Sequence, residues 1–79
     1  MVRMVFEKIQ EVLASQFEVD AEKITRETDI MGDLGADSLD IVELITDLED
    51  EFSIIVTDES IYQCKTVGEM TDFIENLMG

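Results

Sequence analysis

The stretch GDLGADSLDIVELITDLEDEF, residues 32–52, decides how this chain of 79 residues folds. Gly32 and Gly35 indicate turns in the segment that leads into a helix. Asp37 belongs to a residue type that caps helix N-termini well. Asp40 follows three residues later, in the spacing of a capping box. The sequence therefore predicts a helix that begins sharply after Asp37. We expect its core face to consist of Val42, Ile45, Leu48 and Phe52, with Ile41 and Leu44 at the edges.

Helical periodicity also marks the two ends of the chain. Residues 2–16 predict a helix with an apolar face formed by Val2, Phe6, Ile9, Val12 and Leu13. Near the other end, the segment TVGE pairs Thr66 with Glu69 in a second capping box. The helix that begins there repeats apolar residues at helical spacing: Val67, Met70, Phe73, Ile74 and Leu77.

Two connections complete the chain. Residues 17–36 form a long loop, and we expect it to be anchored over the core by Val19, Ile24, Ile30 and Leu34. Residues 53–56 connect to a short helix over residues 58–62, which Thr57 would cap. The sequence thus predicts a single domain over residues 1–79 with an all-α fold. We expect a four-helix bundle with three longer helices, one short third helix and a long loop between helices one and two.

The chain is strongly acidic, with 20 Asp and Glu against 5 Lys and Arg and a formal net charge of −15. Such a surface repels phosphate backbones and anionic membranes, so we expect neither nucleic acid nor a membrane as a partner. The N-terminus lacks the apolar core of a signal peptide, and no apolar run is long enough to span a bilayer. The single cysteine, Cys64, suits a reducing compartment. We therefore expect a monomeric cytoplasmic protein.

The acidic residues are concentrated in one part of the chain. Residues 27–64 contain twelve Asp or Glu and no Lys or Arg. Five of them are spaced three, four, three and one residues apart, which places them on one helix face. We call this face the acidic stripe: Asp40, Glu43, Asp47, Asp50 and Glu51. One interpretation is a solvated face that keeps the protein soluble. Its place beside the only serine of the helix favours the other, a docking surface for basic partner proteins.

The residue types needed for catalysis within this chain are missing. Without His, neither a Ser–His nor a Cys–His pair can form. No two carboxylates are singled out as an acid and base. A calcium loop starting at Asp33 would place Gly35 at a ligand position and Leu44 where the bidentate Glu belongs, so we predict no metal site. Cys64 is most simply a small apolar residue or an incidental thiol.

Ser38 has two interpretations. A hydroxyl in the first turn of a helix can simply be tolerated there. Alternatively, Ser38 is a modification site, because it would be exposed at the end of a long loop where another enzyme can reach it. Backbone N–H groups and the helix dipole would favour an attached phosphate by roughly 0.3–1 kcal/mol. Gly35, without a side chain, would leave room beside it.

The segment DLGADSLDIVEL, residues 33–44, closely resembles the prosthetic-group attachment motif of acyl carrier proteins, whose hallmark is Asp-Ser-Leu opening the second helix. The resemblance extends over the whole chain, through F-x-K-I-Q-E-V-L in the first helix, LEDEF at the end of the second and TVGE before the last. It implies a four-helix bundle with a short third helix. It also implies that Ser38, flanked by Asp37 and Leu39, carries 4′-phosphopantetheine, which a phosphopantetheinyl transferase takes from coenzyme A.

The resemblance further implies a carrier and not an enzyme. Acyl groups would be held as thioesters on the thiol of the arm and presented to ketosynthases, acyltransferases, reductases and dehydratases of dissociated fatty acid synthesis. Basic patches on those enzymes would contact Leu39, Asp40, Glu43, Asp47, Asp50 and Val56. The apolar interior between helices two and three would shelter the acyl chain, with a lining of Val42, Leu44, Ile45, Val56 and Ile61.

The chain departs from the family pattern at three places outside the attachment motif. Family members often carry Ile-Pro-Asp-Glu before the third helix, Leu-Gly-Val after the first and Met-Ala in the second. Here the corresponding segments read VTDE at residues 56–59, FEV at residues 17–19, and Thr46 followed by Asp47. These departures leave the attachment motif intact and concern which partner enzymes the carrier serves. A polyketide-pathway carrier stays open as an alternative, and so does an acidic protein-interaction module without a prosthetic group.

Overall fold

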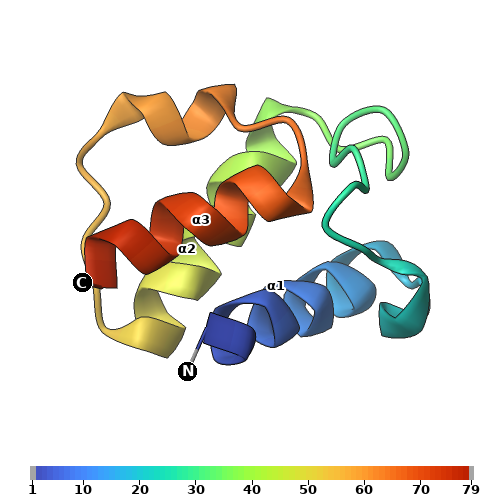
Figure 1. Ribbon diagram of the computed structural model, residues 1–79. Helices are drawn as coiled ribbons and strands as arrows, with labels where there is room; N and C mark the ends of the chain where they lie inside the picture. Colours follow the sequence, from blue (N-terminus) through green and yellow to red (C-terminus); the bar gives the residue numbers. More distant parts are fainter. Residues whose placement is uncertain (1, 79) are drawn as a thin grey trace.

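The computed structural model describes residues 2–78, with side chains over residues 5–78, and is mostly helical (Figure 1). Within these residues it has three α-helices: α1 (Val2–Phe17), α2 (Ser38–Phe52) and α3 (Val67–Met78). Two short 3-10 helices, η1 (Ala21–Lys23) and η2 (Glu59–Gln63), lie in the connections. The three longer helices predicted from the sequence are therefore confirmed.

The short helix differs from its prediction. η2 is a 3-10 helix, and its N-cap is Asp58, whose carboxylate accepts a hydrogen bond from the backbone N–H of Ser60 at 2.9 Å. The expected cap, Thr57, is wrong because the carboxylate of the next residue takes that role. The Ser60 backbone N–H, and after it the Ser60 hydroxyl, lower the pKa of Asp58. Since this element is not an α-helix, the predicted four-helix bundle is not confirmed.

α1 packs against both α2 and α3. It runs antiparallel to α2, as contacts at the two ends of the pair show. In the first half of α1, Lys8 Nζ lies 3.3 Å from Oε2 of Glu51 at the end of α2. Near the end of α1, Gln16 Nε2 donates to the backbone oxygen of Asp40 at 3.1 Å. In Figure 1, α1 (blue) and η2 (orange) lie on opposite sides of α3.

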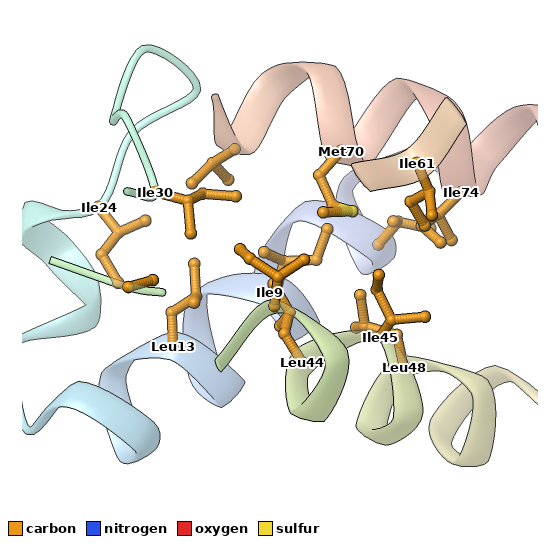
Figure 2. Close-up of a cluster of buried hydrophobic side chains, with 14 residues drawn as sticks. Ile9, Leu13, Ile24, Ile30, Leu44, Ile45, Leu48, Ile61, Met70 and Ile74 are labelled. Atoms are coloured by element: carbon orange, nitrogen blue, oxygen red, sulfur yellow. The ribbon is translucent and has the colours of Figure 1, made fainter. Parts of the chain in front are cut away.

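One apolar core fills the space between the helices (Figure 2). Its fully buried hydrophobic residues come from helices and loops: Ile9, Leu13, Ile24, Ile30, Leu44, Leu48, Ile61, Val67, Met70 and Ile74. Burial of each such side chain contributes about 1.5–3 kcal/mol before entropy is counted. Of the face predicted for α1, Phe6 and Val12 are partly buried, and Val2 lies outside the described side chains.

The core face of α2 is rotated from the predicted one. Its buried residues are Ile41, Leu44, Ile45 and Leu48, in the i, i+3, i+4, i+7 pattern of one helix face. Val42 was expected in the core, but 43% of it is exposed. One residue along a helix is a rotation of about 100°, so a face centred on Ile41 and Ile45 leaves Val42 outside. Phe52 is only partly buried.

The loop between α1 and α2 is tied to the core and to α3. Ile24 and Ile30 are buried as predicted and Leu34 is partly buried, whereas Val19 is exposed and is no anchor. An isolated antiparallel bridge joins Asp29 to Thr66 at the start of α3. Its hydrogen bonds run from Ile30 N to Lys65 O at 2.9 Å and from Val67 N to Thr28 O at 3.0 Å. The long loop is thus an ordered part of the fold.

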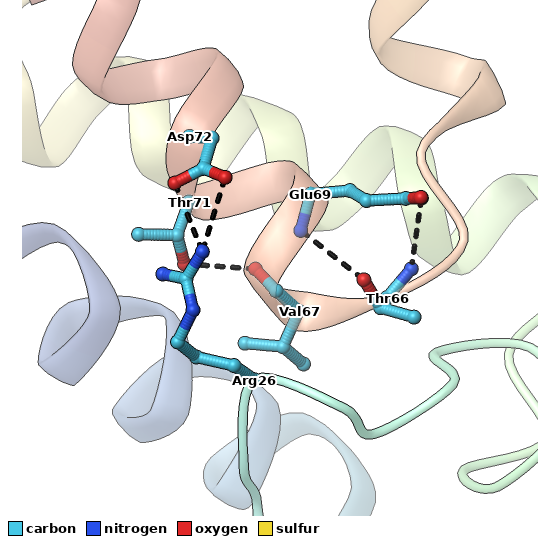
Figure 3. A network of polar contacts seen from close by, with 6 residues as sticks. All are labelled: Arg26, Thr66, Val67, Glu69, Thr71 and Asp72. Carbon is cyan, nitrogen blue, oxygen red and sulfur yellow. Dashed lines mark hydrogen bonds and ion pairs between the residues drawn. The ribbon is translucent and has the colours of Figure 1, made fainter.

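A second set of polar contacts fastens the same loop (Figure 3). Arg26 Nη2 lies 3.0 Å from each carboxylate oxygen of Asp72, and the backbone oxygen of Arg26 accepts from Gly68 N at 2.8 Å. Thr66 and Glu69 form the predicted capping box: Thr66 Oγ1 accepts from Glu69 N at 3.1 Å, and Glu69 Oε1 accepts from Thr66 N at 3.4 Å. The start of α3 therefore holds the segment that leads into α2.

Candidate functional site

The candidate site is built on the capped start of α2. Asp37 has extended backbone angles and is the N-cap, as predicted. Its Oδ1 accepts from the backbone N–H of Asp40 at 3.0 Å, and Oδ2 of Asp40 accepts from the backbone N–H of Asp37 at 3.1 Å. Gly35, with φ of +73°, makes the turn into this cap in a conformation that favours glycine. Both carboxylates thus fix the first turn of the helix.

Ser38 is the first residue of α2 and is exposed. None of the side-chain hydrogen bonds among residues 2–78 uses its hydroxyl. Leu39 beside it is 73% exposed, although it is a large apolar residue. The first turn therefore presents a hydroxyl and an apolar side chain to solvent, at the positive end of the helix dipole.

The acidic stripe follows along the same helix. Glu43, Asp47, Asp50 and Glu51 are exposed, whereas Asp40 is half-buried and its carboxylate is engaged in the cap. Lys8 of α1, which no pattern in the sequence linked to the stripe, lies against Glu51. Lys8 is also 3.9 Å from Glu11 of its own helix. Within the described side chains, no ion pair involves Glu43, Asp47 or Asp50.

The five residues expected to line an acyl-binding interior fall into three groups. Leu44, Ile45 and Ile61 are buried in the core. Val56 is half-buried, and its backbone N–H donates to Oε2 of Glu49 at 2.7 Å, which fixes the segment after α2. Val42 does not face the interior, because it lies in a groove between α1 and α2. The rotation of α2 described above thus leaves Val42 outside the group of buried side chains, at 43% exposure.

Cys64 lies at the end of η2 as a half-buried free thiol. Burial, and after it the carboxylate of Glu69, raise the pKa of this thiol. A raised pKa disfavours the thiolate, so Cys64 is a poor nucleophile at neutral pH. Among the residues the structure describes, no group of His, Cys, Asp and Glu is arranged to hold a metal ion. Over the same residues, no helix is long and apolar enough to cross a bilayer.

Comparison with known proteins shows the family to which the chain belongs. Residues 7–74 match the family described as the phosphopantetheine attachment site. The acyl carrier protein of Lactobacillus acidophilus is 44% identical over 75 residues, which are 95% of this chain and 94% of that protein. The acyl carrier protein of Clostridium acetobutylicum is 47% identical over 72 residues, 91% of this chain and 94% of that one. The chain belongs to the acyl carrier protein family.

A solved structure agrees with this assignment. The acyl carrier protein of Enterococcus faecalis, whose high thermal stability has been studied, matches with a TM-score of 0.81 and 31% sequence identity. The match covers 98% of each chain. The likeness thus includes the loop between α1 and α2 and the segment around η2. The cofactor of this acyl carrier is 4′-phosphopantetheine, the group for which the matched family is described.

The start of α2 fits that cofactor. A phosphodiester needs a hydroxyl that the modifying enzyme can reach, and Ser38 is exposed. A Cβ placed on Gly35 would meet no atom within 4 Å, so the space beside the turn is open. Unpaired backbone N–H groups at a helix N-terminus favour a phosphate. When bound, the arm supplies a terminal thiol that forms thioesters.

Three residues near the site were missed by sequence reasoning. Lys8, Glu11 and Ser15 of α1 line the groove beside the acidic stripe. Their spacing of three and four residues shows that they share a face of α1. It does not show which face of α2 lies opposite. That information comes from the packing of the two helices, and no local signal in the sequence contains it.

Proposed function

We propose that this acyl carrier holds acyl intermediates as thioesters on a 4′-phosphopantetheine arm attached to Ser38, and that it serves dissociated fatty acid synthesis. The observation that supports this best is the exposed hydroxyl of Ser38 at the start of α2, in the sequence Asp37-Ser38-Leu39. Attachment forms a bond between Ser38 Oγ and the phosphorus next to pantetheine in coenzyme A. The pyrophosphate bond breaks, adenosine 3′,5′-bisphosphate leaves, and the hydroxyl proton passes to a base of the transferase.

The chain itself needs no catalytic base in this scheme. Ser38 has no His near it, because the chain contains none. The transferase supplies the base and the metal ion, and the carrier supplies a hydroxyl in a fixed position. The capping box between Asp37 and Asp40 provides that position.

Attachment is tested by intact mass spectrometry after incubation with coenzyme A, magnesium and a broad-specificity phosphopantetheinyl transferase. We expect one addition of the phosphopantetheine mass to the native chain and none to Ser38→Ala. Ser60→Ala is the matched control, because Ser60 is another exposed serine, and it should be modified like the native chain. Addition to Ser38→Ala, or no addition to the native chain, would refute the proposal.

We further propose that partner enzymes dock through basic patches on the acidic stripe and on Leu39 and Val56. Exposed charge pairs give weak, fast and salt-sensitive association, which suits a carrier that visits several enzymes. Replacing Glu43 and Asp47 by Lys should lower the turnover of a ketosynthase acting on the loaded carrier, with little change in helix content by circular dichroism. Glu22→Lys, an exposed change in η1, is the control. Unchanged turnover in the stripe variant would exclude docking on this face.

The acyl chain itself is proposed to lie against apolar side chains between α2 and η2. Leu44, Ile45 and Ile61 are buried there, and Val56 is half-buried beside them. An acyl chain sheltered in this way stabilises the folded state, because its apolar surface is removed from water only when the protein is folded. The octanoyl form should therefore melt at a higher temperature than the form with the bare arm. Equal melting temperatures of the two forms would show that the acyl chain lies in solvent.

Assignment to fatty acid synthesis is tested by reconstitution. The loaded carrier is mixed with malonyl and acetyl donors and with the enzymes of one elongation cycle, and the products are identified by mass. A saturated acyl group longer by two carbons is the expected product. Transfer only to a polyketide ketosynthase would instead favour a polyketide-pathway carrier.

A further inference from the structure

A groove of about 730 Å³ lies between α1 and α2. It extends along residues 8–16 of α1 and residues 42–51 of α2. At 1.5 Å per residue these stretches are about 12 to 14 Å long, the length of roughly two turns of a third helix. One end is marked by the hydrogen bond between Gln16 and Asp40, two residues from Ser38. The groove therefore begins beside the attachment site and leads away from it.

The charges of the groove are unbalanced. Its lining includes five carboxylates, Glu11 from α1 and Glu43, Asp47, Asp50 and Glu51 from α2, against the single ammonium of Lys8. Lys8 lies at the far end, within 3.3 Å of Glu51. Lys8 is also 3.9 Å from Glu11, whereas Glu43, Asp47 and Asp50 have no such partner among the described side chains. A concave surface lined by charge of one sign attracts an opposite charge more strongly than a flat one.

The floor of the groove is apolar. Val12 of α1 is partly buried, and Val42 of α2, excluded from the core, is 43% exposed. Thr46 and Ser15 complete the lining with small side chains that leave room above the valines. An apolar strip beside the acidic bank of α2, with Glu11 on the facing bank of α1, is complementary to a helix that has an apolar stripe flanked by Lys or Arg.

We propose that this groove binds a cationic amphipathic helix of a partner enzyme. Its basic side chains would contact Glu11 on one bank and Glu43 and Asp47 on the other, and one apolar side chain would lie on Val12 and Val42. The identity of the partner as an enzyme that uses the carrier rests on the function proposed above. The inference adds α1 to the docking surface, and it makes Lys8 an internal competitor that a basic side chain of the partner replaces.

The first test uses the whole protein and a defined probe. The probe is a capped helical peptide of Ala, Leu and Arg, with Leu and Arg on one face, and its control has the same composition in scrambled order. We expect the amphipathic peptide to bind at least about fivefold more tightly than the scrambled one, a difference of about 1 kcal/mol. Amide NMR shifts should be largest at Val12, Ser15, Val42 and Thr46. Equal binding, or shifts spread evenly over the acidic surface, would show non-specific attraction and overturn the proposal.

Matched variants separate the groove from net charge. Glu11→Gln should weaken peptide binding about two- to fivefold, the range of one partly exposed charge pair. Glu7→Gln makes the same charge change on α1 outside the groove and should have no comparable effect. Lys8→Gln should strengthen binding by a similar factor, and Lys23→Gln in η1 is its control. Effects of equal size in a variant and its control would exclude a role for the groove.

The enzyme partner is tested with the phosphopantetheinyl transferase. We expect Glu11→Gln to raise the KM for the carrier about twofold with kcat unchanged, as loss of one exposed charge contact would do, and Glu7→Gln to leave both unchanged. Peptide binding could map to the groove while Glu11→Gln leaves the KM for the carrier unchanged with both the transferase and a ketosynthase. Partner enzymes would then not use the groove, and the proposal would fail. Failure of the native chain to be modified at Ser38 would instead refute the proposed function, while the peptide result would stand.

Discussion

The capping box at the start of α2 gives a prediction that separates geometry from charge at the attachment site. Asp37→Ala removes the acceptor of the 3.0 Å hydrogen bond from the backbone N–H of Asp40. Loss of an N-cap side chain costs about 1 kcal/mol, with a range of about 0.5–2 kcal/mol. For a domain of this size, 1 kcal/mol lowers the melting temperature by roughly 4–8 °C.

The helix should nevertheless stay formed in this variant. α2 buries Ile41, Leu44, Ile45 and Leu48, and each of these side chains contributes about 1.5–3 kcal/mol. The free energy contributed by burial of these side chains is therefore several times the contribution of the cap. Helix content by circular dichroism should hardly change at 25 °C. Fraying should be confined to the first turn, which contains Ser38. The initial rate of phosphopantetheine attachment should fall for that reason.

Asp37→Asn is the decisive comparison. Asn keeps an oxygen acceptor and caps helices about as well as Asp, but it has no charge. We expect its melting temperature to stay close to that of the native chain and its attachment rate to exceed that of Asp37→Ala. Thermal melts followed at 222 nm and timed mass spectra measure the two quantities. Equal melting temperatures for Ala and native chains would refute the capping argument. Equal slowing by Asn and Ala would show that the charge, and not the geometry, is what the transferase needs.

Three further predictions concern other parts of the molecule. Gly68→Ala should lower the melting temperature, because the new Cβ would lie 2.9 Å from the backbone oxygen of Arg26. Overpacking of this kind costs about 1–3 kcal/mol, which exceeds the gain of up to about 1 kcal/mol in helix propensity when Gly is replaced by Ala. Gly32→Ala, which meets only the carboxylate of Asp29, should cost less, and a higher melting temperature for Gly68→Ala would contradict the clash. Since burial raises the pKa of Cys64, iodoacetamide at pH 8 should alkylate the native chain more slowly than the urea-unfolded chain; equal rates would mean that the thiol is not shielded. Millimolar magnesium chloride should raise the melting temperature by screening repulsion along the acidic stripe, and a flat response would show that this repulsion is negligible.

The sequence predicted best what is decided locally. The two capping boxes, at Asp37 with Asp40 and at Thr66 with Glu69, are confirmed because the bonded residues lie within one helical turn. The bounds of the three α-helices followed from these caps and from apolar periodicity. The exposed position of Ser38 followed in turn from its place after the cap.

What the sequence could not supply is how the helices are rotated and paired. A helix with apolar residues at positions 41, 42, 44 and 45 has two possible core faces, and the neighbouring helices decide that Ile41 and Leu44 are buried and Val42 is not. The contact between Lys8 and Glu51 depends on the antiparallel packing of α1 and α2. Val19 is exposed and is no anchor; it follows a turn at Glu18, whose φ of 55° is left-handed and which no pattern in the sequence indicated.

The bridge between Asp29 and Thr66 has a consequence for how the chain can be shortened. It joins the approach to α2 with the start of α3, so the two contacts of this bridge form only after the chain has closed a large loop through α2 and η2. The segment before Ser38 consequently gains part of its order from residues that are synthesised last. A fragment ending before α3 would keep the attachment serine in its sequence and lose the ordered path that leads to it.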